Sequence, residues 1–224
     1  MLLPLSKYID HTLLRPEASN EDIIRACEEA KQFDFAAICL YPYWIRAAYK
    51  IIGASSVAIC SVVGFPHGAS KTTTKVREAE IALNDGASEF DMVINLGALK
   101  SAYLDIIYND IRSVVNVVSS NIVKVILETS VLTTKEKITA AKIARDSGAH
   151  FVKTSTGFTG GATIEDVKLL HATVGDSMGI KASGEIRDYK TVLEMIRAGA
   201  TRIGTSTGVK IIKEYYVDRT SSNK

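Results

Sequence analysis

The chain has few cysteines and almost no excess of charge, and each scarcity excludes a class of protein. Its 224 residues include 27 basic and 25 acidic residues, which leaves a net charge of +2. Nucleic-acid-binding surfaces carry a strong basic excess, so we expect no nucleic-acid partner. The three cysteines, Cys27, Cys39 and Cys60, are odd in number and lack metal-ligand spacing. They are predicted to be unpaired thiols in a reducing cytoplasm.

Long apolar runs are missing as well. No stretch approaches the roughly 20 apolar residues of a membrane span. Pro4, Lys7 and Asp10 interrupt the N-terminal segment, where a secretory signal would need an apolar run. The sequence therefore predicts neither a membrane partner nor export.

Histidines are few and scattered. His11, His67, His150 and His171 lie on separate segments without zinc-ligand spacing, so we predict no metal site and no other cofactor. His67, in GFPHG, is interpreted as a turn residue. Cys39, in AAICLYP, is interpreted as a core residue because no base adjoins it.

The chain does contain a regular alternation of short apolar runs and longer amphipathic stretches. The eight strand-like runs are Tyr8–Leu14, Ala36–Leu40, Val57–Phe65, Glu89–Leu96, Val123–Thr129, Phe151–Gly157, Ile180–Gly184 and Arg202–Ser206. The helix-like stretches are Asn20–Lys31, Lys75–Asn84, Asp105–Val118, Thr134–Asp146, Thr163–Ala172 and Asp188–Ala198. Such alternation indicates βαβ units and a parallel sheet. We predict an α/β fold that closes into a single (β/α)8 barrel over residues 1–224, with an open doubly wound sheet as the alternative.

Charged residues lie inside several of these apolar runs, where they are costly unless paired or functional. Lys153 and Lys181 belong to consecutive runs, and we expect both to point into one barrel. Asp91 follows Glu89 on the same face of its run. Active sites of such barrels lie at the carboxyl ends of the strands. The two lysines and Asp91 are therefore candidate catalytic residues.

Two neighbouring inward lysines have a specific chemical use. An ordinary lysine has a pKa of about 10.4, and a nucleophilic amine needs about 7–8. A second ammonium about 4 Å away repels by about 4 kcal/mol at an effective dielectric of about 20, which is enough for this shift. The neutral amine can then attack an aldehyde and form a Schiff base. The alternative is that an inward lysine only pairs with a carboxylate, and we prefer it for Lys124, with Glu89 or Glu128 as partner.

Glycines are concentrated after the later strand-like runs. They are Gly157, Gly160, Gly161, Gly184, Gly204 and Gly208. The loops after the last strands of such barrels often hold a phosphate through backbone N–H groups and a helix N-terminus. The segment GTSTG, Gly204–Gly208, precedes another helix-like run and is a candidate phosphate site.

Taken together, these segments resemble the deoxyribose-phosphate aldolase family. The resemblance extends from IDHTLL through AAICLYP, VVGFPHG, GASEFDMVINLGALKS, VKVILET, FVKTSTGF and IKASGEIRD to GTSTGV. It implies a sugar-phosphate substrate, 2-deoxyribose 5-phosphate, cleaved reversibly into acetaldehyde and glyceraldehyde 3-phosphate by a cytoplasmic homo-oligomer, a dimer or tetramer. It implies that Lys153 forms the Schiff base, that Lys181 tunes it and that Asp91 moves protons. It further implies substrate-binding roles for Asp10 and Thr156, and phosphate-binding roles for Gly157, Gly184, Gly204, Ser206 and Thr207.

The chain departs from the family pattern at two positions. Glu185 stands where many relatives have a second glycine after KASG, and Phe158 stands where some have a lysine after KTSTG. Both departures concern phosphate binding rather than aldol chemistry. Two other functions remain open: a Schiff-base aldolase for another sugar phosphate, and a catalytically silent barrel that binds sugar phosphates.

Overall fold

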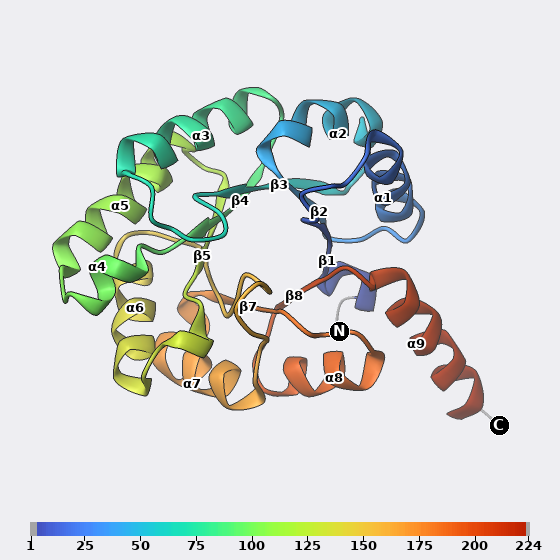
Figure 1. The fold of residues 1–224 in the computed structure, drawn as a ribbon. Coiled ribbons are helices and arrows are strands. Elements are labelled where there is room, and N and C mark those ends of the chain that lie inside the picture. The colour runs from blue at the N-terminus through green and yellow to red at the C-terminus, as the bar shows by residue number, and fades with distance from the viewer. Residues whose placement is uncertain (1–3, 223–224) are drawn as a thin grey trace.

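Eight parallel strands close into a barrel, and helices surround it (Figure 1). The computed structural model describes residues 4–222. Neighbouring strands pair in sequence order from β1 to β8, and β8 pairs with β1. The predicted (β/α)8 barrel is therefore confirmed, and the open sheet is excluded. No helix within the described residues is long and apolar enough to cross a membrane.

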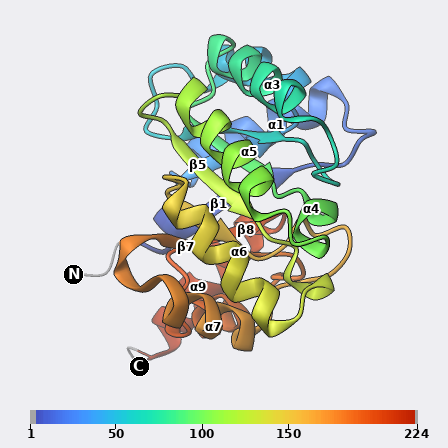
Figure 2. The same ribbon diagram turned by 90° about the vertical axis from the view of Figure 1, so that its left-hand side faces the viewer.

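Each run predicted as a strand overlaps one observed strand. The strands are β1 (Ile9–Leu13), β2 (Ala37–Leu40), β3 (Ala58–Val63), β4 (Glu89–Val93), β5 (Ile122–Ile126), β6 (Phe151–Lys153), β7 (Gly179–Ser183) and β8 (Arg202–Thr205). The helices are α1 (Asn20–Gln32), α2 (Ile45–Ile52), α3 (Thr72–Asn84), α4 (Leu96–Lys100), α5 (Leu104–Val117), α6 (Thr134–Asp146), α7 (Ile164–Val174), α8 (Tyr189–Arg197) and α9 (Gly208–Ser222). Seen from the side, α5, α6 and α7 lie along the outside of the strands, whereas α9 projects from the barrel edge in the first view (Figures 1 and 2).

Capping side chains fix several helix starts. Ser19 and Thr133 begin α1 and α6 with reciprocal capping boxes, and the Thr163 hydroxyl accepts the Asp166 N–H at the start of α7. Several expected strand ends lie too far along the chain: the fourth run was predicted as strand to Leu96, but β4 ends at Val93, and the sixth was predicted to Gly157, but β6 ends at Lys153. The side chain of Asn95 accepts the Ala98 N–H and starts the short helix α4. Helix α2 was not predicted, although its buried residues Ile45, Ala48 and Ile52 have helical spacing.

The barrel has two different cores. Apolar residues from the strands and helices fill the layer between them, and fully buried examples are Ile38, Phe90 and Val152. Inside the barrel, β2 and β3 contribute small or compact side chains, namely Ala37, Cys39, Ala58, Cys60 and Val62. The small residues on this side leave room for long charged side chains from the opposite side. The interior is thus apolar on one side and ionic on the other.

Candidate active site

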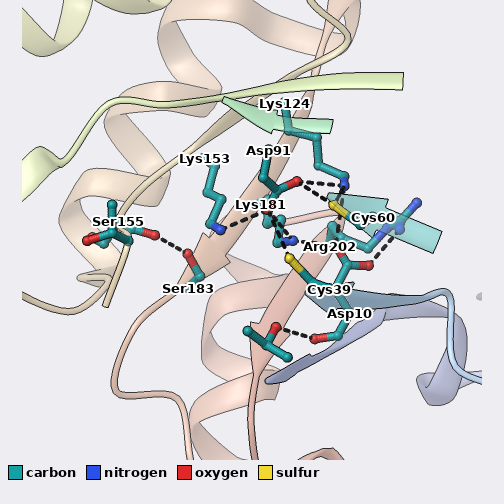
Figure 3. Close-up of polar contacts among 12 residues, drawn as sticks. Asp10, Cys39, Cys60, Asp91, Lys124, Lys153, Ser155, Lys181, Ser183 and Arg202 are labelled. Atoms are coloured by element: carbon teal, nitrogen blue, oxygen red, sulfur yellow. Dashed lines mark hydrogen bonds and ion pairs between the residues drawn. The ribbon is translucent and has the colours of Figure 1, made fainter. Parts of the chain in front are cut away.

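Seven charged side chains meet inside the barrel and form what we call the interior ion network. Its members are Asp10, Glu89, Asp91, Lys124, Lys153, Lys181 and Arg202, contributed by β1, β4, β5, β6, β7 and β8. Figure 3 shows Lys124, Lys153 and Lys181 converging on the carboxylate of Asp91. The sheet register causes this convergence, because Lys153 is paired with Lys181 on β7 and Asp91 with Lys124 on β5.

Asp91 is the centre of the network. Its Oδ2 accepts from Lys153 Nζ at 2.8 Å and from Lys181 Nζ at 2.7 Å, while its Oδ1 accepts from Lys124 Nζ at 2.8 Å. Burial raises the pKa of Asp91, but the charges of Lys124, Lys153 and Lys181 outweigh it and hold that pKa well below its ordinary value. Asp91 is therefore ionised at neutral pH.

Lys124 and Lys181 are held in the charged form. Burial lowers the pKa of Lys181, but Asp10 and Asp91 more than compensate and raise it. Lys124 behaves in the same way: burial lowers its pKa, and Asp91 is the largest influence that raises it. The predicted pairing of Lys124 with Glu89 is present at 2.6 Å, whereas Glu128 contacts Thr156 instead. Both lysines are fully buried, so neither amine is placed to react with a substrate.

The network contains four cationic groups and three carboxylates, an excess of one positive charge. Loss of one proton would leave it neutral. Of the three interior lysines, only Lys153 borders an open pocket. The sequence suggested that Lys153 and Lys181 simply repel each other. That explanation is incomplete, because Asp91 lies between the two lysines and forms an ion pair with each.

The pocket above Lys153 has a volume of about 700 Å³ and opens at the carboxyl ends of the strands. Thr156, Gly157, Gly184, Gly204 and Ser206 line it, as the resemblance implied for a substrate and its phosphate. This volume is ample for a five-carbon sugar phosphate, since small-molecule sites are typically about 300–1,000 Å³. Arg15, Ser183 and Thr205 also line it, although the sequence did not single them out.

Two of the expected residues lie elsewhere. Asp10 is fully buried beneath the pocket, where it bonds Lys181 and Arg202 instead of lining the wall. Thr207 borders a neighbouring groove of about 970 Å³ between α8 and α9, and its N–H donates to Thr205 Oγ1 at 3.1 Å. Lys153 does not line this groove, whereas Ser206 lines both the groove and the pocket.

Two of the glycines are required by close packing. A Cβ at Gly184, where φ is +89°, would lie 2.8 Å from the Gly160 carbonyl oxygen, so this position excludes other residues on both grounds. A Cβ at Gly204 would lie 3.0 Å from Lys181 Cε. Gly204 thus makes room for the Lys181 side chain in addition to lining the pocket.

Glu185 has a left-handed backbone, with φ of 62°, in the loop between β7 and α8. Its side chain lies against Gly161, where an added Cβ would be 2.9 Å from Glu185 Oε2. No ion pair joins it to Arg187 or Lys190 within the described residues. A non-glycine residue with a left-handed backbone destabilises the fold by about 1–2 kcal/mol. Replacing it with glycine recovers only part of this stability, because glycine also increases the conformational entropy of the unfolded chain.

Glu185→Gly is therefore expected to raise the melting temperature by about 2 °C and to lower the KM for a sugar phosphate about threefold, since it removes both the strain and a screened charge. Glu185→Gln is the matched control, because it removes the charge and keeps the strain. It should lower KM without raising the melting temperature. Thermal unfolding and steady-state kinetics measure both quantities. If neither variant changed KM, Glu185 would have no influence on phosphate binding.

Arg202 and Glu128 were missed as members of the site. Arg202 Nη1 donates to Asp10 Oδ1 at 2.7 Å and lies 3.3 Å from Glu89. It stands at the start of an apolar run, so the search for charges inside strands could have found it. The sequence analysis considered Glu128 only as a partner of Lys124. Its contact with Thr156 could not be predicted, because it depends on the conformation of the loops after β5 and β6.

One group of ligand-type atoms lies within the network. Cys39 Sγ, Cys60 Sγ and an Asp91 oxygen are all within 4.8 Å of one another, and no other such group of three occurs in residues 4–222. Both Asp91 oxygens already accept hydrogen bonds from ammonium groups. Burial raises the pKa of the Cys60 thiol well above its ordinary value, which opposes the thiolate that a metal would need. The structure thus uses Asp91 to bind lysines.

Comparison with known proteins gives a consistent result over nearly the whole chain. The family model described as DeoC/LacD family aldolase matches residues 5–214. The chain is 55% identical over 212 residues to a deoxyribose-phosphate aldolase of Streptococcus sanguinis, covering 94% of this chain and 96% of that protein. It is 49% identical to the protein of the same name from Brevibacillus brevis, covering 93% and 95% respectively.

Solved structures agree. The tetrameric deoxyribose phosphate aldolase of Aeropyrum pernix superposes with a TM-score of 0.87 at 34% identity and covers 95% of this chain and 91% of its own. An aldolase called QR15 superposes with a TM-score of 0.93 at 39% identity, covering 98% and 99%.

Proposed function

Because the chain belongs to the DeoC/LacD family of aldolases, we propose that it reversibly cleaves 2-deoxyribose 5-phosphate into acetaldehyde and glyceraldehyde 3-phosphate. The observation that carries this proposal is the position of Lys153. Its amine borders the pocket and bonds Asp91, while the other two interior lysines are sealed beneath it.

The chemistry follows from that position. The neutral Lys153 amine attacks the C1 aldehyde and, with loss of water, forms an iminium. The iminium draws the electron pair of the C2–C3 bond as that bond breaks, and C3 leaves as the aldehyde of glyceraldehyde 3-phosphate. The enamine that remains is protonated at C2 and hydrolysed to acetaldehyde. The Schiff-base role of Lys153 is thus the basis of the proposal.

The other members of the network have supporting roles in the proposal. Asp91 contacts the reacting nitrogen and exchanges protons around it. Lys181 remains charged and balances Asp91 and Asp10, so that Lys153 can become neutral without leaving carboxylates unpaired. The loops carrying Gly157, Gly184, Gly204 and Ser206 offer backbone N–H groups for the phosphate, which would place C5 away from Lys153.

The direct test is cleavage of 2-deoxyribose 5-phosphate by the purified protein, with a coupled assay for glyceraldehyde 3-phosphate. We expect turnover without added metal, and a KM at least about tenfold lower for the phosphorylated sugar than for 2-deoxyribose, because a bound phosphate makes several charge-assisted hydrogen bonds. Absence of glyceraldehyde 3-phosphate at high enzyme concentration would contradict the proposal.

Glu185 favours one alternative, a Schiff-base aldolase for another sugar phosphate. Its carboxylate lines the pocket beside the phosphate-binding glycines, and a carboxylate can accept from an additional substrate hydroxyl. A panel of ketose and aldose phosphates with the same coupled assay separates the two substrates. A catalytically silent barrel would give no borohydride-trapped adduct with any of them.

We also propose a cytoplasmic homo-oligomer. Cys27, Cys39 and Cys60 are all unpaired, as suits a reducing compartment. Helix α5 and the residue before it expose a run of large apolar side chains: Tyr103, Leu104, Ile106 and Tyr108. Exposed apolar patches of this kind mark association surfaces, and the Aeropyrum pernix relative is described as a tetramer.

A further inference from the structure

Glu128 is a buried carboxylate that the chemistry above does not use. It follows β5 at the point where the strand ends, and its backbone is left-handed, with φ of 58° and ψ of 60°. Its exposed fraction is 2%, and no cation lies within ion-pair distance of it in the described part of the chain. Strained backbone and buried unpaired charge both destabilise a fold, and they are concentrated at functional sites.

The backbone on both sides of Glu128 is fixed. The Leu127 N–H donates to the Lys153 carbonyl and the Thr129 N–H to the Thr154 carbonyl, each at 2.9 Å. Glu128 is therefore anchored directly beside the segment that carries Lys153. Its carboxylate accepts the Thr156 N–H at 3.3 and 3.4 Å and also the Thr156 hydroxyl.

The Thr156 hydroxyl has one hydrogen-bonding position left. A hydroxyl has one donor and two acceptor positions. The donor is used on Glu128, and one acceptor position takes the Phe158 N–H at 3.1 Å. Thr156 lines the pocket together with Lys153, so the free lone pair is available to the substrate. Only a hydrogen-bond donor can occupy it.

We propose that Glu128 and Thr156 form a proton relay that activates the C3 hydroxyl of the substrate. This inference rests on the proposed aldolase function. In the cleavage direction the C3 hydroxyl gives its proton to Thr156 Oγ1, which passes its own proton to Glu128 Oε2. The C3 oxygen becomes a carbonyl, the C2–C3 bond breaks, and its electron pair forms the enamine on Lys153. Condensation reverses every step, and no oxidant or other co-reactant is needed.

Thr156 would be the group that touches the substrate, and Glu128 a positioning residue that acts through it. This assignment separates two proton transfers. Asp91 and Lys153 serve C1 and C2, whereas Glu128 and Thr156 serve only the oxygen at C3. A reaction that involves C2 but has no C3 hydroxyl should therefore be indifferent to Glu128.

Acetaldehyde provides that reaction. Its iminium on Lys153 loses and regains C2 protons, so its methyl group exchanges deuterium from D₂O, which proton NMR measures. The variant Glu128→Gln keeps the shape of the side chain but cannot take up a proton. We expect cleavage of 2-deoxyribose 5-phosphate to fall about a hundredfold, as for loss of a general base, while acetaldehyde exchange stays within twofold of wild type.

Thr156 variants test the same relay independently and serve if Glu128→Gln does not fold. Thr156→Val should show the same split between cleavage and exchange, and Thr156→Ser, which keeps the hydroxyl, should recover most of the cleavage that Val loses. An equal loss of cleavage and exchange in both Glu128→Gln and Thr156→Val, or cleavage at the wild-type rate in either, would overturn the relay. A wild-type protein that exchanges acetaldehyde but does not cleave the sugar phosphate would instead refute the proposed substrate.

Discussion

Lys153→Ala is expected to lower the rate of cleavage by at least about ten-thousand-fold, the scale seen when a covalent nucleophile is removed. The physical reason is that no other interior amine borders the pocket, because Lys124 and Lys181 are fully buried. Within residues 4–222, Asp91 is the one ion-pair partner of Lys153, and Asp91 keeps two further ammonium partners, so the fold should survive. Steady-state kinetics and circular dichroism measure the two properties.

Covalent trapping identifies the residue directly. Wild-type protein treated with acetaldehyde and borohydride should carry an N-ethyl group on Lys153, located by peptide mass spectrometry. Lys153→Met is a control of similar length without the amine, and it should remain unlabelled there and inactive. An adduct found mainly on Lys124 or Lys181 would reverse the assignment.

Asp91→Asn should lose both activity and stability. The substitution removes the base in contact with Lys153, so cleavage and acetaldehyde exchange should both fall about a hundredfold to a thousandfold. It also leaves three ammonium groups around a neutral amide, and breaking such a buried pair costs about 3–5 kcal/mol. Urea unfolding and NMR exchange provide the two measurements.

Glu89→Gln is the matched control for Asp91→Asn. Glu89 is also a buried carboxylate of the interior ion network and pairs with Lys124 at 2.6 Å, but no ion pair within the described residues joins it to Lys153. It should therefore cost comparable stability and much less activity. Equal loss of activity in the two variants would show that the network matters only through its total charge, and would remove the specific role of Asp91.

The trapping, Asp91 and Glu128 experiments distinguish three levels of the mechanism. A variant that forms no adduct has lost the Schiff base and therefore every later step. A variant that forms the adduct but does not exchange deuterium has lost proton transfer at C2. A variant that has lost only cleavage has lost proton transfer at the C3 oxygen. In the proposed mechanism the order of these effects follows from what each side chain would contact: the substrate carbon for Lys153, the Lys153 nitrogen for Asp91, and Thr156 for Glu128.

The sequence alone was sufficient for the architecture and for the principal chemical groups. Eight short apolar runs separated by amphipathic stretches are a local property, and each overlaps an observed strand because parallel strands covered on both faces must be apolar. The same rule revealed Lys153, Lys181 and Asp91, since a charge in such a run has to be paired or functional.

The partners of those charges could be known only from the tertiary structure. That Asp91 lies between Lys153 and Lys181, and that Lys181 reaches Asp10, depends on the closure of β8 onto β1 and on the inter-strand register. These pairs are separated by 62 to 171 residues in the chain, and no local pattern encodes such contacts.

Accessibility was likewise decided by the three-dimensional packing. The three interior lysines all lie within apolar runs and cannot be distinguished by their sequence context, yet only Lys153 borders the pocket. The conformation of two loops was also decided by packing. The backbones of Glu128 and Glu185 are left-handed, a conformation that residues with side chains disfavour, because hydrogen bonds and packing on either side fix these loops. The sequence by itself thus determined the barrel and its candidate nucleophiles. Burial, register and loop conformation, which arise only when distant segments pack together, decided which amine borders the pocket and which carboxylate contacts it.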